Sequence, residues 1–213
     1  MSKQAFYPVC IALGLLLLAA CRPTPTPAPV PAAPTVSPAA GKGQVLMVIA
    51  PRDFRDEEYT RPREILESAG YAVTVASRPR ETARGMLGMR VQPDLLLSEA
   101  RAADYDAVVF VGGSGAQTYW DDPEAHRLAR EAAEGGKVVA AICIAPVILA
   151  RAGVLEGKQA TVFDPPSLCA ELTAHGATCT GASVQRDGRI VTASGPQAAE
   201  DFARSILAAL EER

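Results

Sequence analysis

Cys143 is the residue of this sequence best placed to act as a nucleophile. It directly follows VVAAI (138–142), an apolar run typical of a buried strand, and it precedes 145–152, which predicts a helix. A cysteine at such a junction occupies the position of a nucleophile elbow, where the helix N-terminus is expected to lower the pKa of the thiol. The alternative is a small apolar residue buried at a strand end.

Few histidine and cysteine side chains are available to bind a metal or assist that thiol. The only histidines are His126 and His175, and none of the five cysteines has CxxC spacing, so we expect no metal and no cofactor. We expect His126 to face solvent from a predicted helix at 123–134. His175 precedes Gly176 at a helix end, where a cation is favoured.

Cys169 and Cys179 lie ten residues apart, on a predicted helix and the strand after it. A disulfide between them would stabilise the fold by roughly 2–3 kcal/mol in an oxidising compartment. Two separately buried thiols are the alternative, and the sequence leaves both open.

The elements that must position these residues alternate along 43–213. Strands are predicted at 44–50, 72–76, 107–111, 138–142, 159–163 and 177–180, with a hairpin at 184–193 around Asp187-Gly188, and helices at 58–69, 123–134, 145–152, 167–175 and 197–211. Residues 77–104 predict a short hairpin and a connector. Such alternation predicts a three-layer α/β sandwich with a mostly parallel sheet. Ligands then bind beyond the carboxyl ends of the strands, at loops 51–58, 112–115 and 143–146.

The N-terminus predicts export and lipidation. Thirteen residues from Val9 to Cys21 carry no charge, a length typical of a signal-peptide core rather than of a membrane-spanning helix. The run ends in LAAC (18–21), which resembles the bacterial lipobox, where cleavage leaves a lipidated cysteine. Residues 1–20 are thus the expected signal peptide, which would remove Cys10, and Cys21 is the expected membrane anchor. An uncleaved anchor or a plain secretory signal are the alternatives.

A proline-rich linker follows the lipobox and joins it to the folded domain. Residues 22–40 contain seven of the chain's 17 prolines and no acidic residue, so 21–42 is expected to be an extended tether. The expected location is a lipid-anchored position facing the periplasm or the cell exterior. The net charge of -3 predicts no binding of nucleic acid.

Four segments of 43–213 resemble the DJ-1/PfpI family. They are DFRDEEYTRPREILESAGYAVTVAS (53–77), VVFVGGSGA (108–116), KVVAAICIAPVILARAGVLEGK (137–158) and GRIVTASGP (188–196). The resemblance implies a flavodoxin-like fold in which the reactive elbow cysteine is Cys143. It also implies an acidic residue beside the sulfur, which the family pattern places at Glu58, with Glu57 as the alternative. Backbone N–H groups of Gly113 and Ile144 would then form an oxyanion site.

The sequence departs from the protease-like members of this family. Those proteins carry a histidine after the nucleophile, where this chain has Ile144, and other relatives draw one from about twenty residues downstream, where it has Phe163 and Asp164. Without a Cys–His dyad, peptidase activity is disfavoured.

Three functions fit the remaining residues. Glyoxalase or deglycase chemistry on small aldehydes or glycated substrates needs only a thiolate, an oxyanion site and one proton shuttle. A cysteine-based oxidative-stress sensor and a non-catalytic envelope lipoprotein are the alternatives. A homodimer is left open.

Overall fold

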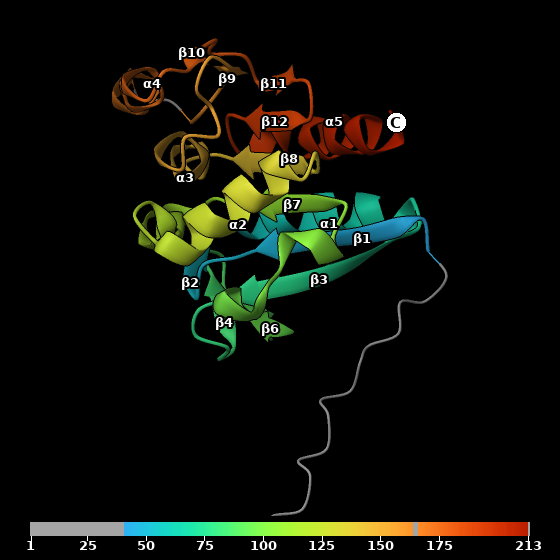
Figure 1. Ribbon diagram of the computed structural model, residues 1–213. Helices are drawn as coiled ribbons and strands as arrows, with labels where there is room; N and C mark the ends of the chain where they lie inside the picture. The colour runs from blue at the N-terminus through green and yellow to red at the C-terminus, as the bar shows by residue number, and fades with distance from the viewer. Residues whose placement is uncertain (1–40, 164–165, 213) are drawn as a thin grey trace, which may run out of the picture. The chain divides into compact units, whose positions relative to one another are not determined.

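The computed structural model describes residues 41–163 and 166–212, whose centre is a β-sheet between helices (Figure 1). Within these residues the sheet has seven strands in the order β11-β12-β8-β7-β1-β3-β6. The strands are β1 (Gly43–Val48), β3 (Tyr71–Ser77), β6 (Leu95–Leu96), β7 (Ala107–Phe110), β8 (Val138–Ile142), β11 (Val184–Asp187) and β12 (Ile190–Ala193). All neighbouring pairs are parallel except β11 and β12, which form an antiparallel hairpin.

Helices cover both faces of this sheet. Helix α1 (Asp56–Ser68) packs against α5 (Ala199–Glu211), and α2 (Pro123–Glu134) packs against α3 (Pro146–Arg151). Figure 1 shows α2 in front of the sheet and α1 behind it, and α4 (Pro166–Ala174) packs against α3. The predicted three-layer α/β fold is therefore confirmed.

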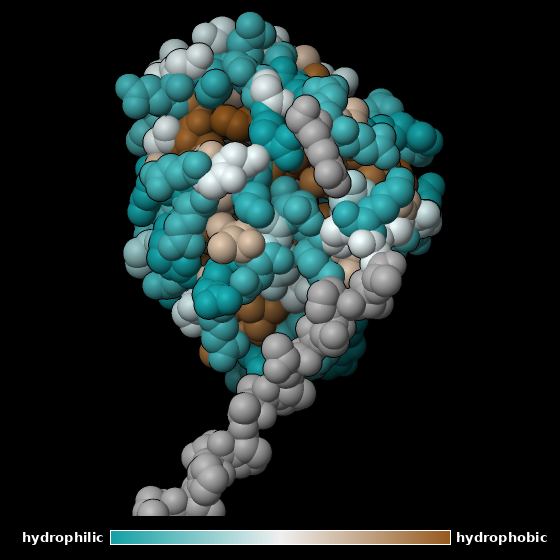
Figure 2. All heavy atoms as spheres, turned by 45° about the vertical axis from the view of Figure 1, so that its right-hand side comes forward, coloured by the Kyte–Doolittle hydropathy of each residue, from teal (hydrophilic) through white to brown (hydrophobic). Residues whose placement is uncertain are grey.

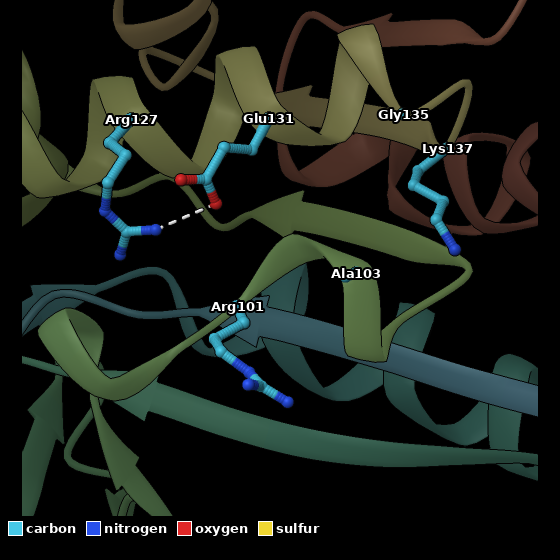
Figure 3. Close-up of a pocket in the computed structure, with 6 residues that line it drawn as sticks. All are labelled: Arg101, Ala103, Arg127, Glu131, Gly135 and Lys137. Carbon is cyan, nitrogen blue, oxygen red and sulfur yellow. Dashed lines mark hydrogen bonds and ion pairs between the residues drawn. The ribbon is translucent and has the colours of Figure 1, made fainter.

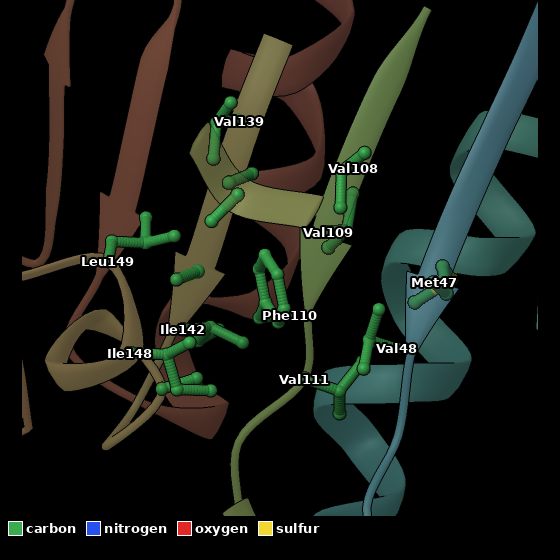
Figure 4. Close-up of a cluster of buried hydrophobic side chains, with 14 of the residues drawn as sticks. Met47, Val48, Val108, Val109, Phe110, Val111, Val139, Ile142, Ile148 and Leu149 are labelled. Atoms are coloured by element: carbon green, nitrogen blue, oxygen red, sulfur yellow. The ribbon is translucent and has the colours of Figure 1, made fainter. Parts of the chain in front are cut away.

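The middle strands are buried on both faces. Every residue of β7 and β8 is buried, as the apolar runs in the sequence predict. Figure 4 shows Phe110, Ile142 and Ile148 lying together between these two strands and α3. Each such side chain contributes about 1.5–3 kcal/mol through burial. The loops that leave β7 and β8 therefore start from fixed points.

Several element boundaries differ from the sequence-based predictions. Helix α1 begins at Asp56, two residues before the expected start, because three acidic residues occupy its first turn, where the helix dipole favours them. Strand β9 is limited to Gln159–Ala160 and pairs with β10 (Thr178–Cys179) in a separate sheet. It ends early because the chain turns so that the Phe163 N–H binds the Cys143 carbonyl at 2.8 Å.

The loops also contain structure that the sequence did not predict. Strand β2 (Arg52–Phe54) lies inside the expected loop 51–58 and forms a second small sheet with β4 (Ala83–Gly85) and β5 (Arg90–Val91). Strands β4 and β5 confirm the short hairpin expected within 77–104. Asp187 pairs with Ile190, so the turn of the later hairpin is Gly188-Arg189 and not Asp187-Gly188.

Four short 3₁₀ helices complete the described chain. They are η1 (Leu97–Glu99), η2 (Ala102–Asp104), η3 (Ser114–Tyr119) and η4 (Pro196–Ala198). Of these, η3 follows the glycine-rich loop after β7, and η4 leads directly into α5.

Hydrophobic atoms form only small separate areas on the face shown in Figure 2, among mostly hydrophilic ones. Within the described ranges, the large hydrophobic side chains that are exposed are Met86, Leu87 and Phe163. Scattered exposure of this kind is ordinary, so the position of these three residues matters more than their number.

The predicted signal peptide, lipobox and nearly all of the linker lie outside the described residues, as does Asp164. This includes Cys10 and Cys21. Across 41–163 and 166–212, none of the helices combines the length and apolar character needed to cross a membrane.

Candidate functional site

Cys143 lies in the sharp turn between β8 and α3. Its φ angle is +63°, a conformation that non-glycine residues rarely adopt, so the strained backbone expected of an elbow is present. Two hydrogen bonds hold the turn: the Cys143 N–H donates to the Ala193 carbonyl at 2.9 Å, and the Cys143 carbonyl accepts from Phe163 at 2.8 Å. Both backbone groups of the nucleophile are thus fixed.

Glu58 approaches the sulfur from the first turn of α1 and is completely buried. Its carboxyl group is near enough to the Cys143 thiol and the Gly112 N–H for each to lower its pKa, although neither oxygen makes a hydrogen bond of ordinary geometry. Glu57 turns away and pairs with Arg55, with 2.8 Å between Glu57 Oε2 and Arg55 Nε. The structure therefore brings Glu58, and not Glu57, to Cys143.

Glycine is needed at 112 and 113 because neighbouring groups leave no room for a side chain. A Cβ atom at Gly112 would overlap the Glu58 carboxylate and the Cys143 Cβ. At Gly113, where φ is +93°, it would overlap the backbone of Asp53 and Arg55. Because these two positions have no side chain, Glu58 and Cys143 can both lie close to the loop and to each other.

Burial dominates the protonation of the acid and the thiol. It raises the pKa of Glu58 from 4.5 to about 7, while the Cys143 thiol and the Arg55 charge partly offset the rise. Burial, followed by the Glu58 charge, raises the pKa of Cys143 from 9.0 to about 12. The lowered thiol pKa expected from the helix N-terminus is therefore wrong, because burial and the neighbouring carboxylate outweigh the dipole of a six-residue helix.

The backbone N–H groups of Gly113 and Ile144 both lie at the sulfur, where they lower the pKa of the Cys143 thiol. This is where the sequence placed an oxyanion site. The indole N–H of Trp120 donates to the Ile144 carbonyl at 3.2 Å and helps to hold that residue in place. Trp120 was not identified from the sequence, because nothing in its local pattern shows this contact.

A cavity of about 420 Å³ opens onto this group of residues. Its walls are formed by Arg55, Glu58, Met86, Gly113, Ser114, Gln117, Cys143, Ile144, Phe163, Pro196 and Gln197. They come from the ends of β7 and β8, the start of α1, and loops on either side. This volume lies in the range of small-molecule sites.

Asp56 is a second buried acid of α1 that sequence analysis missed. Its carboxylate accepts hydrogen bonds from the N–H groups of Leu87 and Met89, both at 2.9 Å. It thereby anchors the turn between β4 and β5, which carries Met86 to the cavity wall. The acidic run 56–58 was visible in the sequence, but which of its members are buried was not.

Neither histidine lines the cavity. His126 is half-buried, with 2.7 Å between its Nε2 atom and the Trp120 carbonyl oxygen, so the expectation that it faces solvent is wrong. His175 is exposed and lies 3.4 Å from a Glu171 carboxylate oxygen. No group of metal-ligating side chains occurs among the residues that the structure describes.

A disulfide joins Cys169 on α4 to Cys179 on β10, with their Cα atoms 5.6 Å apart. Of the two arrangements left open by the sequence, the structure contains the bridge. Cys143 is the free cysteine within the described part of the chain.

A second depression lies between α2 and η2, and neither cysteine nor histidine lines it (Figure 3). It has a volume of about 610 Å³ and is lined by Arg101, Ala103, Arg127, Glu131, Gly135 and Lys137. Arg127 pairs with Glu131 at 2.9 Å, as Figure 3 shows, and Arg101 pairs with Asp104 at 3.0 Å. These arginines already have carboxylate partners, whereas Cys143 and Glu58 line the other cavity, which is therefore the candidate functional site.

The pH dependence of stability tests whether Glu58 is as buried as the structure shows. The folded pKa of about 7 exceeds the ordinary 4.5, so the folded protein binds a proton more tightly than the unfolded chain. This stability is fully present below pH 4.5 and is lost as the pH rises through about 7, and it amounts to about 3 kcal/mol. Relative to wild type, Glu58→Gln should gain stability over this window in urea unfolding.

Glu64→Gln is the matched control, because Glu64 is an exposed residue of the same helix. Its difference from wild type should stay constant between pH 4.5 and 8. A pH-independent difference for Glu58→Gln would contradict the elevated pKa.

Known proteins resemble this chain in sequence and in fold. The sequence model of the DJ-1/PfpI family matches residues 43–209. An uncharacterized protein of Methanocaldococcus jannaschii is 42% identical over 170 residues, covering 79% of this chain and 83% of that protein. A deglycase of Pyrococcus horikoshii is 31% identical over 151 residues, covering 71% and 90%. The crystal structure of a ThiJ/PfpI domain protein from Brachyspira murdochii has a TM-score of 0.77 and 38% identity, covering 80% and 97%.

Proposed function

Because the chain belongs to the DJ-1/PfpI family, we propose that it is a cysteine-dependent enzyme of the glyoxalase or deglycase type, acting on reactive aldehydes or glycation adducts. The observation that carries this proposal is the pairing of Cys143 with a buried acid whose pKa is about 7. Such an acid can accept and return a proton near neutral pH. The deglycase named among the relatives supports the same class of chemistry.

The first step is addition of the sulfur to an aldehyde. The Cys143 proton moves to the Glu58 carboxylate as sulfur forms a bond to the aldehyde carbon, C1. The carbonyl electron pair moves to oxygen, where the N–H groups of Gly113 and Ile144 stabilise the charge. Glu58 then returns the proton to this oxygen and yields a hemithioacetal.

The second step is an internal oxidation and reduction of an α-oxoaldehyde. Glu58 removes the proton on C1 and delivers it to C2, while the hydroxyl proton passes from the oxygen on C1 to that on C2. C1 becomes a thioester and C2 an alcohol, so no external oxidant is needed. Water hydrolyses the thioester, releases a 2-hydroxy acid and restores the thiol.

The decisive experiment is incubation of the purified protein with methylglyoxal, with lactate as the measured product. Lactate formation that depends on Cys143 supports the proposal. Its absence, together with a Cys143 that readily gains two oxygen atoms in peroxide, would instead support the sensor function. A protonated Glu58 can donate a hydrogen bond to an oxidised Cys143, and this contact favours the sensor as the second candidate.

The proposal also includes a location for the protein, which is the cell envelope. The LAAC sequence and the proline-rich 21–42 support a mature chain that begins at a lipidated Cys21 and carries the domain 43–213 on a tether. The disulfide between Cys169 and Cys179 supports an oxidising compartment, because disulfides are rare in the cytosol.

Substitution of Cys21 tests the lipid anchor. Cys21→Ala should move the protein from the membrane fraction to the soluble fraction or leave an uncleaved precursor, because no thiol remains to carry lipid. Cys143→Ala is the matched control and should stay in the membrane fraction. Intact mass decides the outcome: a wild-type chain that begins at Met1, or an unmodified Cys21, contradicts the anchor.

A further inference from the structure

Two of the three large hydrophobic side chains exposed on the described protein lie at the cavity that contains Cys143. Met86 and Phe163 are each 43% exposed, and both line this cavity. Leu87 is more exposed, at 65%, but does not line it. Exposed apolar side chains that gather at one opening mark a surface that binds something apolar.

Met86 is held in a fixed position relative to the acid. Its N–H donates to the Phe54 carbonyl at 2.9 Å. The Asp56 carboxylate accepts hydrogen bonds from the N–H groups of Leu87 and Met89 in the same turn. Asp56 lies two residues before Glu58 on α1. The first turn of one helix therefore positions both the proton-transfer group and one apolar wall.

Phe163 is tied to the nucleophile in a similar way. Its N–H donates to the Cys143 carbonyl at 2.8 Å. Its ring packs over Gly195, where a Cβ atom would lie 3.3 Å from Phe163 Cδ2. The backbones of both residues are therefore fixed near the sulfur, and their side chains line the cavity there.

The cavity is larger than the proposed reaction needs. At about 420 Å³ it exceeds a dicarbonyl of two or three carbons, and part of the surplus wall is formed by Met86, Ile144, Phe163 and Pro196. Resting on the proposed function, we infer that the site prefers α-oxoaldehydes with a large apolar or aromatic substituent. The substituent contacts Met86 and Phe163 while the aldehyde carbon meets Cys143.

The test compares phenylglyoxal with methylglyoxal, using the full-length chain purified in detergent. We expect wild type to show a kcat/KM ratio of at least about 10 in favour of phenylglyoxal. Phe163→Ala and Met86→Ala should each lower that ratio roughly 10-fold, a usual size for lost apolar pocket contacts. Phe163→Leu should retain most of it. Comparing ratios among variants cancels the intrinsic reactivity of the two aldehydes.

Leu87→Ala is the matched control, because Leu87 neighbours Met86 but lies outside the cavity wall. Its ratio should equal that of wild type. Equal use of both aldehydes by wild type, or a ratio unchanged in Phe163→Ala, would overturn the inference while leaving the proposed function intact. If Phe163→Ala instead changes the oligomeric state in solution and leaves the kcat/KM ratio unchanged, the inference is also overturned. The Phe163 side chain would then belong to an interface between copies of the chain.

A binding measurement separates this inference from the proposed reaction. Mandelate, the product expected from phenylglyoxal, should bind Cys143→Ser about 10-fold more tightly than lactate, and Phe163→Ala in that background should remove the difference. This result would support the apolar site even if no aldehyde were turned over. Equal affinity for the two acids in Cys143→Ser would overturn it.

Discussion

The Cys143→Ser variant is expected to convert no measurable methylglyoxal. A serine hydroxyl can occupy the same turn, but its oxygen is a far weaker nucleophile than the cysteine sulfur that gives up its proton to Glu58. The backbone bonds from Cys143 to Ala193 and Phe163 do not depend on the side chain, so the fold should be preserved. Lactate formation and the circular dichroism spectrum are the measurements.

Cys143→Ala should be equally inactive, and His175→Ala should be near wild type because His175 is exposed and does not line the cavity. Wild-type turnover by Cys143→Ser would disprove the mechanism. If even the wild type is inactive but forms sulfinate readily, the oxidative-stress sensor takes its place.

The Glu58→Gln variant is expected to lose roughly 10²–10⁴-fold in kcat, the usual contribution of a general acid/base. Glutamine fills the same buried space but can neither accept the Cys143 proton nor carry it from C1 to C2. Glu64→Gln, on the exposed side of the same helix, should keep full activity. A loss of less than about threefold in Glu58→Gln would show that another group moves the proton.

The pH dependence of kcat/KM gives a second test of the role of Glu58. The active form of the pair holds one proton between Glu58 and Cys143, so kcat/KM of wild type should rise with pH through about 7, where Glu58 loses its proton. In Glu58→Gln this limb should disappear. Retention of the limb in the variant would assign it to another group.

The elements and the position of the nucleophile were predictable from the sequence because they depend on local patterns. Continuous apolar runs such as 138–142 identify strands buried on both faces, and Asp122-Pro123 marks the start of α2, where Asp122 accepts hydrogen bonds from two N–H groups of the first turn. A cysteine between such a strand and a helix predicts the elbow. The family segments added the acid in the first loop, to within one residue.

What remained was decided by contacts between residues far apart in the chain. Glu58 and Glu57 differ by one position, and only the packing of α1 against the glycine loop shows that the former is buried at the sulfur while the latter pairs with Arg55. Burial also reversed the expected direction of the thiol pKa. A local pattern records how a segment alternates between apolar and polar residues, whereas desolvation and charge at a site are sums over every segment that packs around it.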